Sequence, residues 1–161
     1  FDVVFCPFML MFVPEQSKAI AEMWRVLRPG GRLVISVWTA LEGNPVYAEL
    51  VKIATNRVDA QAGRSLALPF SLGEAETLEN LLHAAGVSPV EITTREGRAC
   101  FPSLEDFVHA EIKAWVLADS VGDSNISVVV DDARTALAGY CHSDGSIDFP
   151  MSAVIATAAK F

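Results

Sequence analysis

The 161-residue sequence lacks the features that identify membrane proteins and nucleic-acid-binding proteins. No apolar run approaches the roughly 18 residues that cross a bilayer, and no charged-then-apolar signal segment opens the chain. Lysine and arginine number 12 against 20 acidic residues, for a net charge of −8, so no basic stripe is available to a phosphate backbone. We therefore expect a cytoplasmic protein with no nucleic-acid or membrane partner.

Cysteine is scarce and widely spaced. Cys6, Cys100 and Cys141 form neither a C-x-x-C pair nor a cysteine and histidine metal pattern, and their number is odd. We interpret them as small apolar residues in a reducing compartment, and we expect no metal site.

Several signatures of enzyme active sites are also absent: G-x-S-x-G, G-x-x-x-x-G-K-S/T and H-E-x-x-H. None of the ten glycines lies in a G-x-G arrangement. The chain opens directly on an apolar strand, with no initiator Met and no glycine-rich loop before it. We therefore expect it to be the later part of a longer enzyme.

The sequence does contain a βαβ pattern at its start, in a chain that is 52% hydrophobic and can bury a core. An apolar strand over 1–6 leads through the proline-punctuated loop 7–14 into an amphipathic helix that begins near Glu15. Pro29 ends the helix, and the following two glycines supply a tight reversal before a second apolar strand, 33–38. This order predicts a right-handed parallel crossover.

The middle of the chain predicts two more helices. Pro45 suits the first position of a helix that runs to about residue 58, and 59–70 reads as a polar connection. Ser71 and Glu74 form a capping box for the next helix, and Gly86 is its C′ residue.

The rest of the chain predicts strands around further helices. Residues 90–94 alternate as in a half-exposed strand that Gly97 interrupts, and Ser103 can cap a following helix. Residues 119–127 resemble a linker, and 128–141 could be a helix or, because it opens with three valines, a strand. A final strand is expected over 149–158.

Four stretches of the βαβ region together resemble the back half of a class I S-adenosylmethionine-dependent methyltransferase. They are Phe1-Asp2-Val3-Val4, Phe12-Val13-Pro14-Glu15, Glu22 to Leu33 with its Arg-Val-Leu-Arg-Pro-Gly-Gly run, and Ser36-Val37-Trp38. Segments 69–72, 84–87, 101–107 and 144–151 resemble the C-terminal part of a subgroup that acts mostly on small molecules.

The resemblance implies an α/β fold of partial Rossmann-like type, with a central, mostly parallel sheet flanked by helices. Residues 1–6 and 33–38 would be the family's fourth and fifth strands, and about 88–95 and 149–158 the last two, the final one antiparallel. The chain, 1–161, would be the C-terminal part of a methyltransferase domain, with 98–142 a mostly helical insertion before the last strand.

The resemblance also implies S-adenosylmethionine as cofactor, although the family's main binding loop has no counterpart in the sequence. Because ligands of open α/β sheets bind beyond the carboxyl ends of the strands, the expected cofactor-binding residues are Cys6, Pro7, Phe8 and Met11. Trp38 either lines the substrate pocket or packs in the core or rim. No residue is assigned as catalytic.

We therefore expect a fragment of an enzyme that transfers a methyl group to a small molecule, inactive in isolation. The alternative is a non-catalytic α/β interaction module. Both hypotheses leave the first strand at an open sheet edge, which predicts a homo-oligomer or a swapped dimer.

Overall fold

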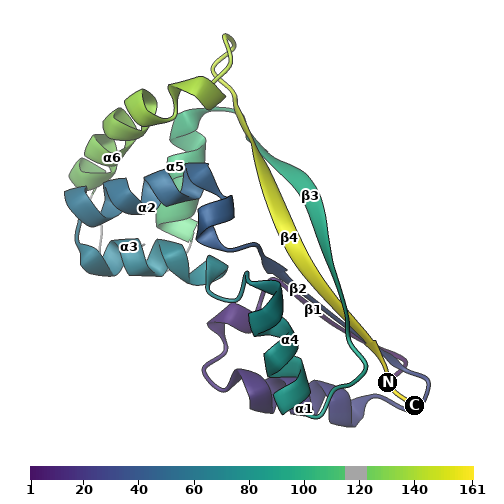
Figure 1. Ribbon diagram of the computed structural model, residues 1–161. Helices are drawn as coiled ribbons and strands as arrows, with labels where there is room; N and C mark the ends of the chain where they lie inside the picture. The colour runs from purple at the N-terminus through teal and green to yellow at the C-terminus, as the bar shows by residue number, and fades with distance from the viewer. Residues whose placement is uncertain (115–122) are drawn as a thin grey trace. The chain divides into compact units, whose positions relative to one another are not determined.

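The computed structural model describes residues 1–114 and 123–161, which form an α/β protein with a four-stranded sheet (Figure 1). The chain divides into two compact units. Unit 1 comprises 1–40, 69–97 and 152–161, and unit 2 comprises 41–68 and 98–151.

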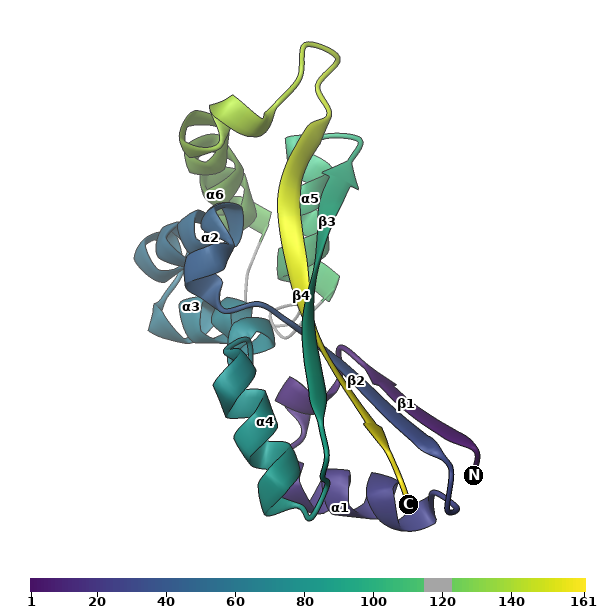
Figure 2. The ribbon, with the colours of Figure 1, turned by 45° about the vertical axis from the view of Figure 1, so that its right-hand side comes forward.

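The sheet has the strand order β1-β2-β4-β3. The strands are β1 (Val3–Pro7), β2 (Arg32–Trp38), β3 (Glu91–Phe101) and β4 (Ile147–Ala159). β1 and β2 pair in parallel, with Cys6 opposite Ile35, whereas β2 and β4 are antiparallel. The expected fold class, the parallel crossover and the antiparallel final strand are confirmed, and β1 lies at the edge of the sheet (Figure 2).

The core of unit 1 lies between one face of the sheet and two helices, α1 (Gln16–Val26) and α4 (Ala75–Ala84). Successive strand residues point to opposite faces, so β2 buries Leu33, Ile35 and Val37 with at most 1% exposure. The buried residues of the helices complete this core with Ile20 from α1 and Leu78 and Leu82 from α4. The amphipathic pattern that predicted both helices therefore corresponds to their buried stripes.

The turn between α1 and β2 takes the form that its glycines predict. Gly30 has φ +79°, a conformation that residues with a Cβ rarely adopt. Its N–H donates to the carbonyl of Lys160, and the Lys160 N–H donates to the carbonyl of Gly31 at 2.9 Å. The end of the chain is thereby fixed to this turn.

Unit 2 is mostly helical. It contains α2 (Pro45–Arg57), α3 (Ala60–Ala67), α5 (Leu104–Ala114) and α6 (Asp123–Ala136). Four aromatic rings meet in its core at centroid distances of 5.1 to 5.8 Å: Tyr47, Phe101, Phe107 and Phe149. In the two units together, the described residues also form four short 3-10 turns: Leu10–Phe12, Leu41–Gly43, Leu68–Phe70 and Ala138–Tyr140.

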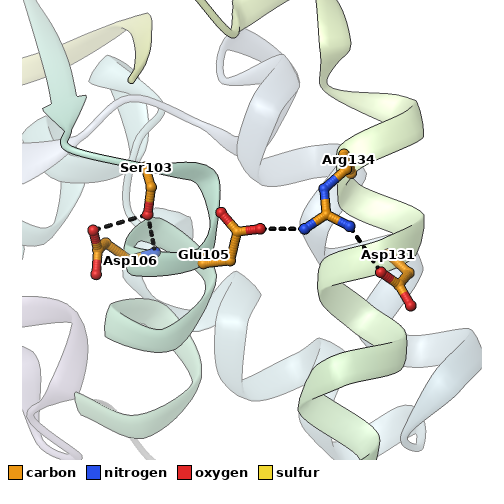
Figure 3. A network of polar contacts seen from close by, with 5 residues as sticks. All are labelled: Ser103, Glu105, Asp106, Asp131 and Arg134. Carbon is orange, nitrogen blue, oxygen red and sulfur yellow. Dashed lines mark hydrogen bonds and ion pairs between the residues drawn. The ribbon is translucent and has the colours of Figure 1, made fainter. Parts of the chain in front are cut away.

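A polar network at the start of α5 confirms the cap expected of Ser103 (Figure 3). The Ser103 hydroxyl accepts from the Asp106 N–H at 3.0 Å. In the same first turn of α5, Glu105 forms an ion pair with Arg134 of α6, which also contacts Asp131 at 2.9 Å. The Arg134 guanidinium therefore joins α5 to α6.

Three local expectations were wrong. Residues 60–67 form α3 rather than a polar connection, because Asp59 caps it by accepting from the Ala62 N–H at 2.7 Å. The capping box at Ser71 does not form, since α4 begins after Glu74 without a side-chain cap. Gly97 does not interrupt β3, which runs on to Phe101.

Two further expectations concern the segment from residue 119 to residue 141. Residues 128–136 are helical, within α6, so the helix is the correct alternative there. Of the expected linker 119–127, residues 123–127 belong to α6 and the others lie outside the described residues.

Candidate functional site

The candidate site lies at the carboxyl ends of β1 and β2. Because the two strands are parallel, these ends lie side by side. β1 ends at Pro7, and the N–H of Phe8 donates to the carbonyl of Ser36 at 2.9 Å. Phe8 is the only described non-glycine residue with positive φ, at +50°. Such left-handed backbone is uncommon outside glycine, asparagine and aspartate, and is often found at ligand sites.

The ring of Phe8 stacks on that of Trp38, the last residue of β2. Their centroids are 4.0 Å apart and their planes differ by 18°. Both side chains are half-buried. Two expected site residues, one from each strand, therefore meet as a single aromatic surface at the carboxyl edge.

Cys6 is half-buried on β1, beside Ile35. Burial raises the pKa of its thiol above the ordinary value, although hydrogen bonds from the Met9 and Leu10 backbone oppose the shift. The thiol is therefore neutral at physiological pH, which does not suit a nucleophile or a base.

The other two expected cofactor residues occupy different surroundings. Pro7 is exposed at the end of β1, whereas Met11 is 3% exposed and packs in the core of unit 1. The intervening Met9 is 55% exposed, so this loop presents one thioether outward and buries the other.

Ser36 is a candidate that the sequence analysis missed. It is 5% exposed, and its hydroxyl has no hydrogen-bond partner among the described residues. Ser36 and Trp38 share a face of β2, because side chains two apart along a strand point the same way. The available signal was a single polar residue within the apolar run Leu33 to Trp38.

The end of β2 is also fixed by neighbouring backbone. Thr39 donates to the Ser152 carbonyl from its N–H at 3.0 Å and from its hydroxyl at 3.2 Å. Gly73 lies so close that a Cβ there would be 2.0 Å from the Ala40 nitrogen and 2.2 Å from the Thr39 carbonyl carbon. Trp38 is therefore followed by a tightly held segment.

The described residues contain no group of three or more histidine, cysteine or acidic side chains placed to hold a metal ion. The described helices also include none that is both long and apolar enough to cross a membrane.

Comparison with known proteins matches this part of the chain to a family. The family model described as "Methyltransferase domain" matches residues 1–35, which contain β1, α1 and most of β2. These residues are therefore similar to part of a methyltransferase domain. The expected resemblance to the class I methyltransferases is thereby confirmed.

Two curated methyltransferases are similar over a longer stretch. The ubiquinone/menaquinone biosynthesis C-methyltransferase of Ralstonia nicotianae is 35% identical over 103 residues, covering 56% of this chain and 41% of that protein. The protein of the same name from Ralstonia pickettii is 34% identical over the same length. The match therefore spans about two fifths of the length of the curated relatives.

Solved structures show the same fold. A putative methyltransferase from Bacillus halodurans gives a TM-score of 0.57 at 15% identity, with 99% of this chain and 64% of that chain covered. The YcgJ protein from Bacillus subtilis gives a TM-score of 0.54 at 14% identity, with the same coverage. The fold shared with these structures thus extends well beyond the residues that match the family model.

Proposed function

We propose that the chain is part of an S-adenosylmethionine-dependent methyltransferase that acts on a small molecule. The observation that carries the proposal is the family match to β1, α1 and β2, the elements whose carboxyl edge presents the Phe8–Trp38 aromatic surface. The alternative of a non-catalytic interaction module gains no support from this match.

The aromatic surface suits a sulfonium ligand in its chemistry. S-Adenosylmethionine supplies a methyl group bound to a positively charged sulfur, and cations bind favourably over the faces of Trp and Phe rings. We assign the cofactor contacts to Cys6, Pro7 and Phe8, with Met11 supporting the loop from the core. Trp38 is assigned to the acceptor side.

The protein's task in this reaction is alignment. Methyl transfer is an in-line displacement, and holding two reactants in line can lower a barrier by on the order of 7 to 11 kcal/mol. A rigid edge suits that role, and Trp38 is followed by the hydrogen-bonded Thr39 and the closely packed Gly73. A general base is needed only for a weakly nucleophilic acceptor.

Ultraviolet cross-linking of tritiated S-adenosylmethionine to the chain, followed by tryptic mapping, tests the proposed cofactor site. We expect the label in the peptides that span 1–18 and 33–52, and we expect excess S-adenosylhomocysteine to remove it. Labelling elsewhere, or labelling that the competitor leaves unchanged, would contradict the assignment.

A pair of variants refines this experiment. Phe8→Leu should lower the labelling, whereas Phe101→Leu, which alters an aromatic residue of unit 2, should leave it unchanged. Because the sequence has no G-x-G loop, we expect the isolated chain to bind the cofactor weakly and to be inactive. A submicromolar dissociation constant would contradict that expectation.

We also propose that the chain self-associates through β1 and that it acts in the cytoplasm. Support for self-association comes from the position of β1 at the sheet edge and from its exposed apolar residues. Phe1, Val3 and Phe5 are 76%, 58% and 61% exposed. Unpaired edges with apolar side chains favour pairing with another chain.

A further inference from the structure

Three features lie close together near the end of β2, and one of them is polar. The first is the buried hydroxyl of Ser36, which has no hydrogen-bond partner among the described residues. The second is the left-handed backbone of Phe8, and the third is the stacking of its ring on Trp38. A buried polar group without a partner costs about 1 to 3 kcal/mol, and a ligand that hydrogen-bonds to the hydroxyl would offset this cost.

We propose that Ser36 is a positioning residue for the methyl acceptor, with Trp38 as the aromatic wall of the same subsite. The hydroxyl forms a hydrogen bond with a polar group of the acceptor, and the Trp38 ring contacts a flat apolar part. This inference rests on the proposed methyltransferase function. It adds a specificity determinant, because a buried unpaired hydroxyl discriminates against ligands that cannot hydrogen-bond to it.

Phe8 is tied to Ser36 through the backbone. Its neighbour Pro7 pairs with Ser36 across the β1–β2 ladder, and its own N–H donates to the Ser36 carbonyl. Left-handed backbone at a residue with a large side chain costs on the order of 1 to 3 kcal/mol. The hydrogen bond from the Phe8 N–H to Ser36 and the stacking of the Phe8 ring on Trp38 hold this conformation in place.

Binding of two fragments, phenol and toluene, tests the proposal. Both carry a flat six-membered ring, and only phenol has a hydroxyl. Each is titrated into the ¹⁵N-labelled chain, and the Trp38 indole N–H resonance, identified by its absence from Trp38→Phe, reports binding. We expect both fragments to shift this resonance, with phenol binding more tightly.

Ser36→Ala removes only the hydroxyl. Since a net hydrogen bond contributes roughly 1 kcal/mol, we expect the ratio of toluene to phenol dissociation constants to fall about fivefold in Ser36→Ala. Ser71→Ala, which changes an exposed serine before α4, should leave the ratio unchanged. A ratio that is equal in the wild type and Ser36→Ala would overturn the proposal.

Stability provides an independent readout. If the hydroxyl has no partner in the free protein, Ser36→Ala should be at least as resistant to urea as the wild type. Lower resistance would mean that the hydroxyl bonds within the protein, which also overturns the proposal. Neither fragment measurement involves the cofactor, so failed cross-linking of S-adenosylmethionine would count against the methyltransferase function and not against this subsite.

Discussion

At the scale of single residues, the Tyr47–Glu111 pair is the most strongly perturbed pair of titratable groups among the described residues. The Tyr47 hydroxyl donates to Oε1 of Glu111 at 3.0 Å, and Tyr47 is 6% exposed. Burial raises the pKa of Glu111, although the hydrogen bond from Tyr47 opposes the shift. Burial and the neighbouring carboxylate also raise the pKa of Tyr47. The hydrogen bond therefore persists well into the alkaline range.

Glu111→Gln should change how stability depends on pH. Because folding raises the pKa of this carboxyl above its ordinary 4.5, its contribution to stability is fully present below pH 4.5 and is lost as pH rises through the folded-state pKa. Glutamine does not titrate. The free energy of unfolding of Glu111→Gln, relative to the wild type, should therefore increase from pH 4 to pH 8 in urea titrations.

The matched control is Glu76→Gln, which removes a carboxylate that is exposed on α4. If both variants differ from the wild type in free energy of unfolding by the same amount at every pH, burial of Glu111 is not the cause of the pH dependence.

Some of these residue roles were predictable and others were not. Gly86 was identified as a C′ residue from its position after an apolar stripe, and it has φ +80° with the Val87 N–H donating to the Leu82 carbonyl. Local spacing suffices there, because the motif closes within six residues. The Tyr47–Glu111 pair joins positions 64 apart, and no local pattern encodes such a partner.

At the scale of elements, the carboxyl end of α1 is held by a residue from the far end of the chain. The ammonium of Lys160 donates to the carbonyls of Trp24, Arg25 and Leu27 at 2.6, 3.2 and 2.9 Å. It also lies 5.6 Å from the centroid of the Trp24 ring. The last carbonyls of a helix have no partner within the helix, so Lys160 supplies both hydrogen bonds and a favourable charge.

Lys160→Met should therefore destabilise unit 1 by about 1.5 to 3 kcal/mol, the range for hydrogen bonds made by a charged group. Lys52→Met is the control, because Lys52 forms an exposed ion pair with Glu49, and its loss should cost less than about 1 kcal/mol. The free energy of unfolding measured in urea distinguishes the two. Equal losses would show that Lys160 does not cap the helix.

The close approach of Gly73 to the end of β2 gives a second prediction for the elements. Gly73→Ala places a Cβ against the backbone of Thr39 and Ala40, which cannot move aside as a flexible side chain can. We expect a loss of about 1 to 3 kcal/mol and a shift of the Trp38 indole resonance. Gly139→Ala, where a Cβ would meet nothing within 4 Å, should change neither quantity.

Elements with a strong apolar periodicity in the sequence were predictable. Elements that depend on a cap or on strand pairing were harder to predict. The stripes of α1 and α4 and the apolar runs of β1 and β2 identified these elements correctly. α3 was missed because its start depends on the cap at Asp59, within a polar stretch. β3 continues through Gly97 because pairing with β4 overrides the low strand preference of glycine.

At the scale of the whole molecule, the exposed edge of the sheet is the feature that governs association. A charge on an edge strand opposes pairing with a second chain. Phe5→Lys should therefore lower self-association in sedimentation equilibrium, whereas Val128→Lys, at an exposed apolar position of unit 2, should not. A wild type that sediments as a stable monomer at high concentration would exclude the proposed association.

Local patterns in the sequence identified β1, α1 and β2, but they carry little information about the division of the chain into units. The family motifs lie in β1, α1 and β2, whereas unit 2 combines residues 41–68 with 98–151. The expected insertion, 98–142, is a continuous stretch and so could not include α2 and α3. Contacts such as the ion pair between Arg57 and Asp132, which join the two stretches, leave no trace in local composition.

The place of β4 in the sheet has a consequence for synthesis on the ribosome. β2 pairs along its whole length with β4, from Arg32 opposite Ala159 to Trp38 opposite Ala153. At roughly 5 to 20 residues per second, the nascent chain waits on the order of 6 to 25 seconds between completing β2 and completing β4. During that interval the apolar β2 has one unpaired edge, and chaperones that recognise extended apolar segments have time to bind it.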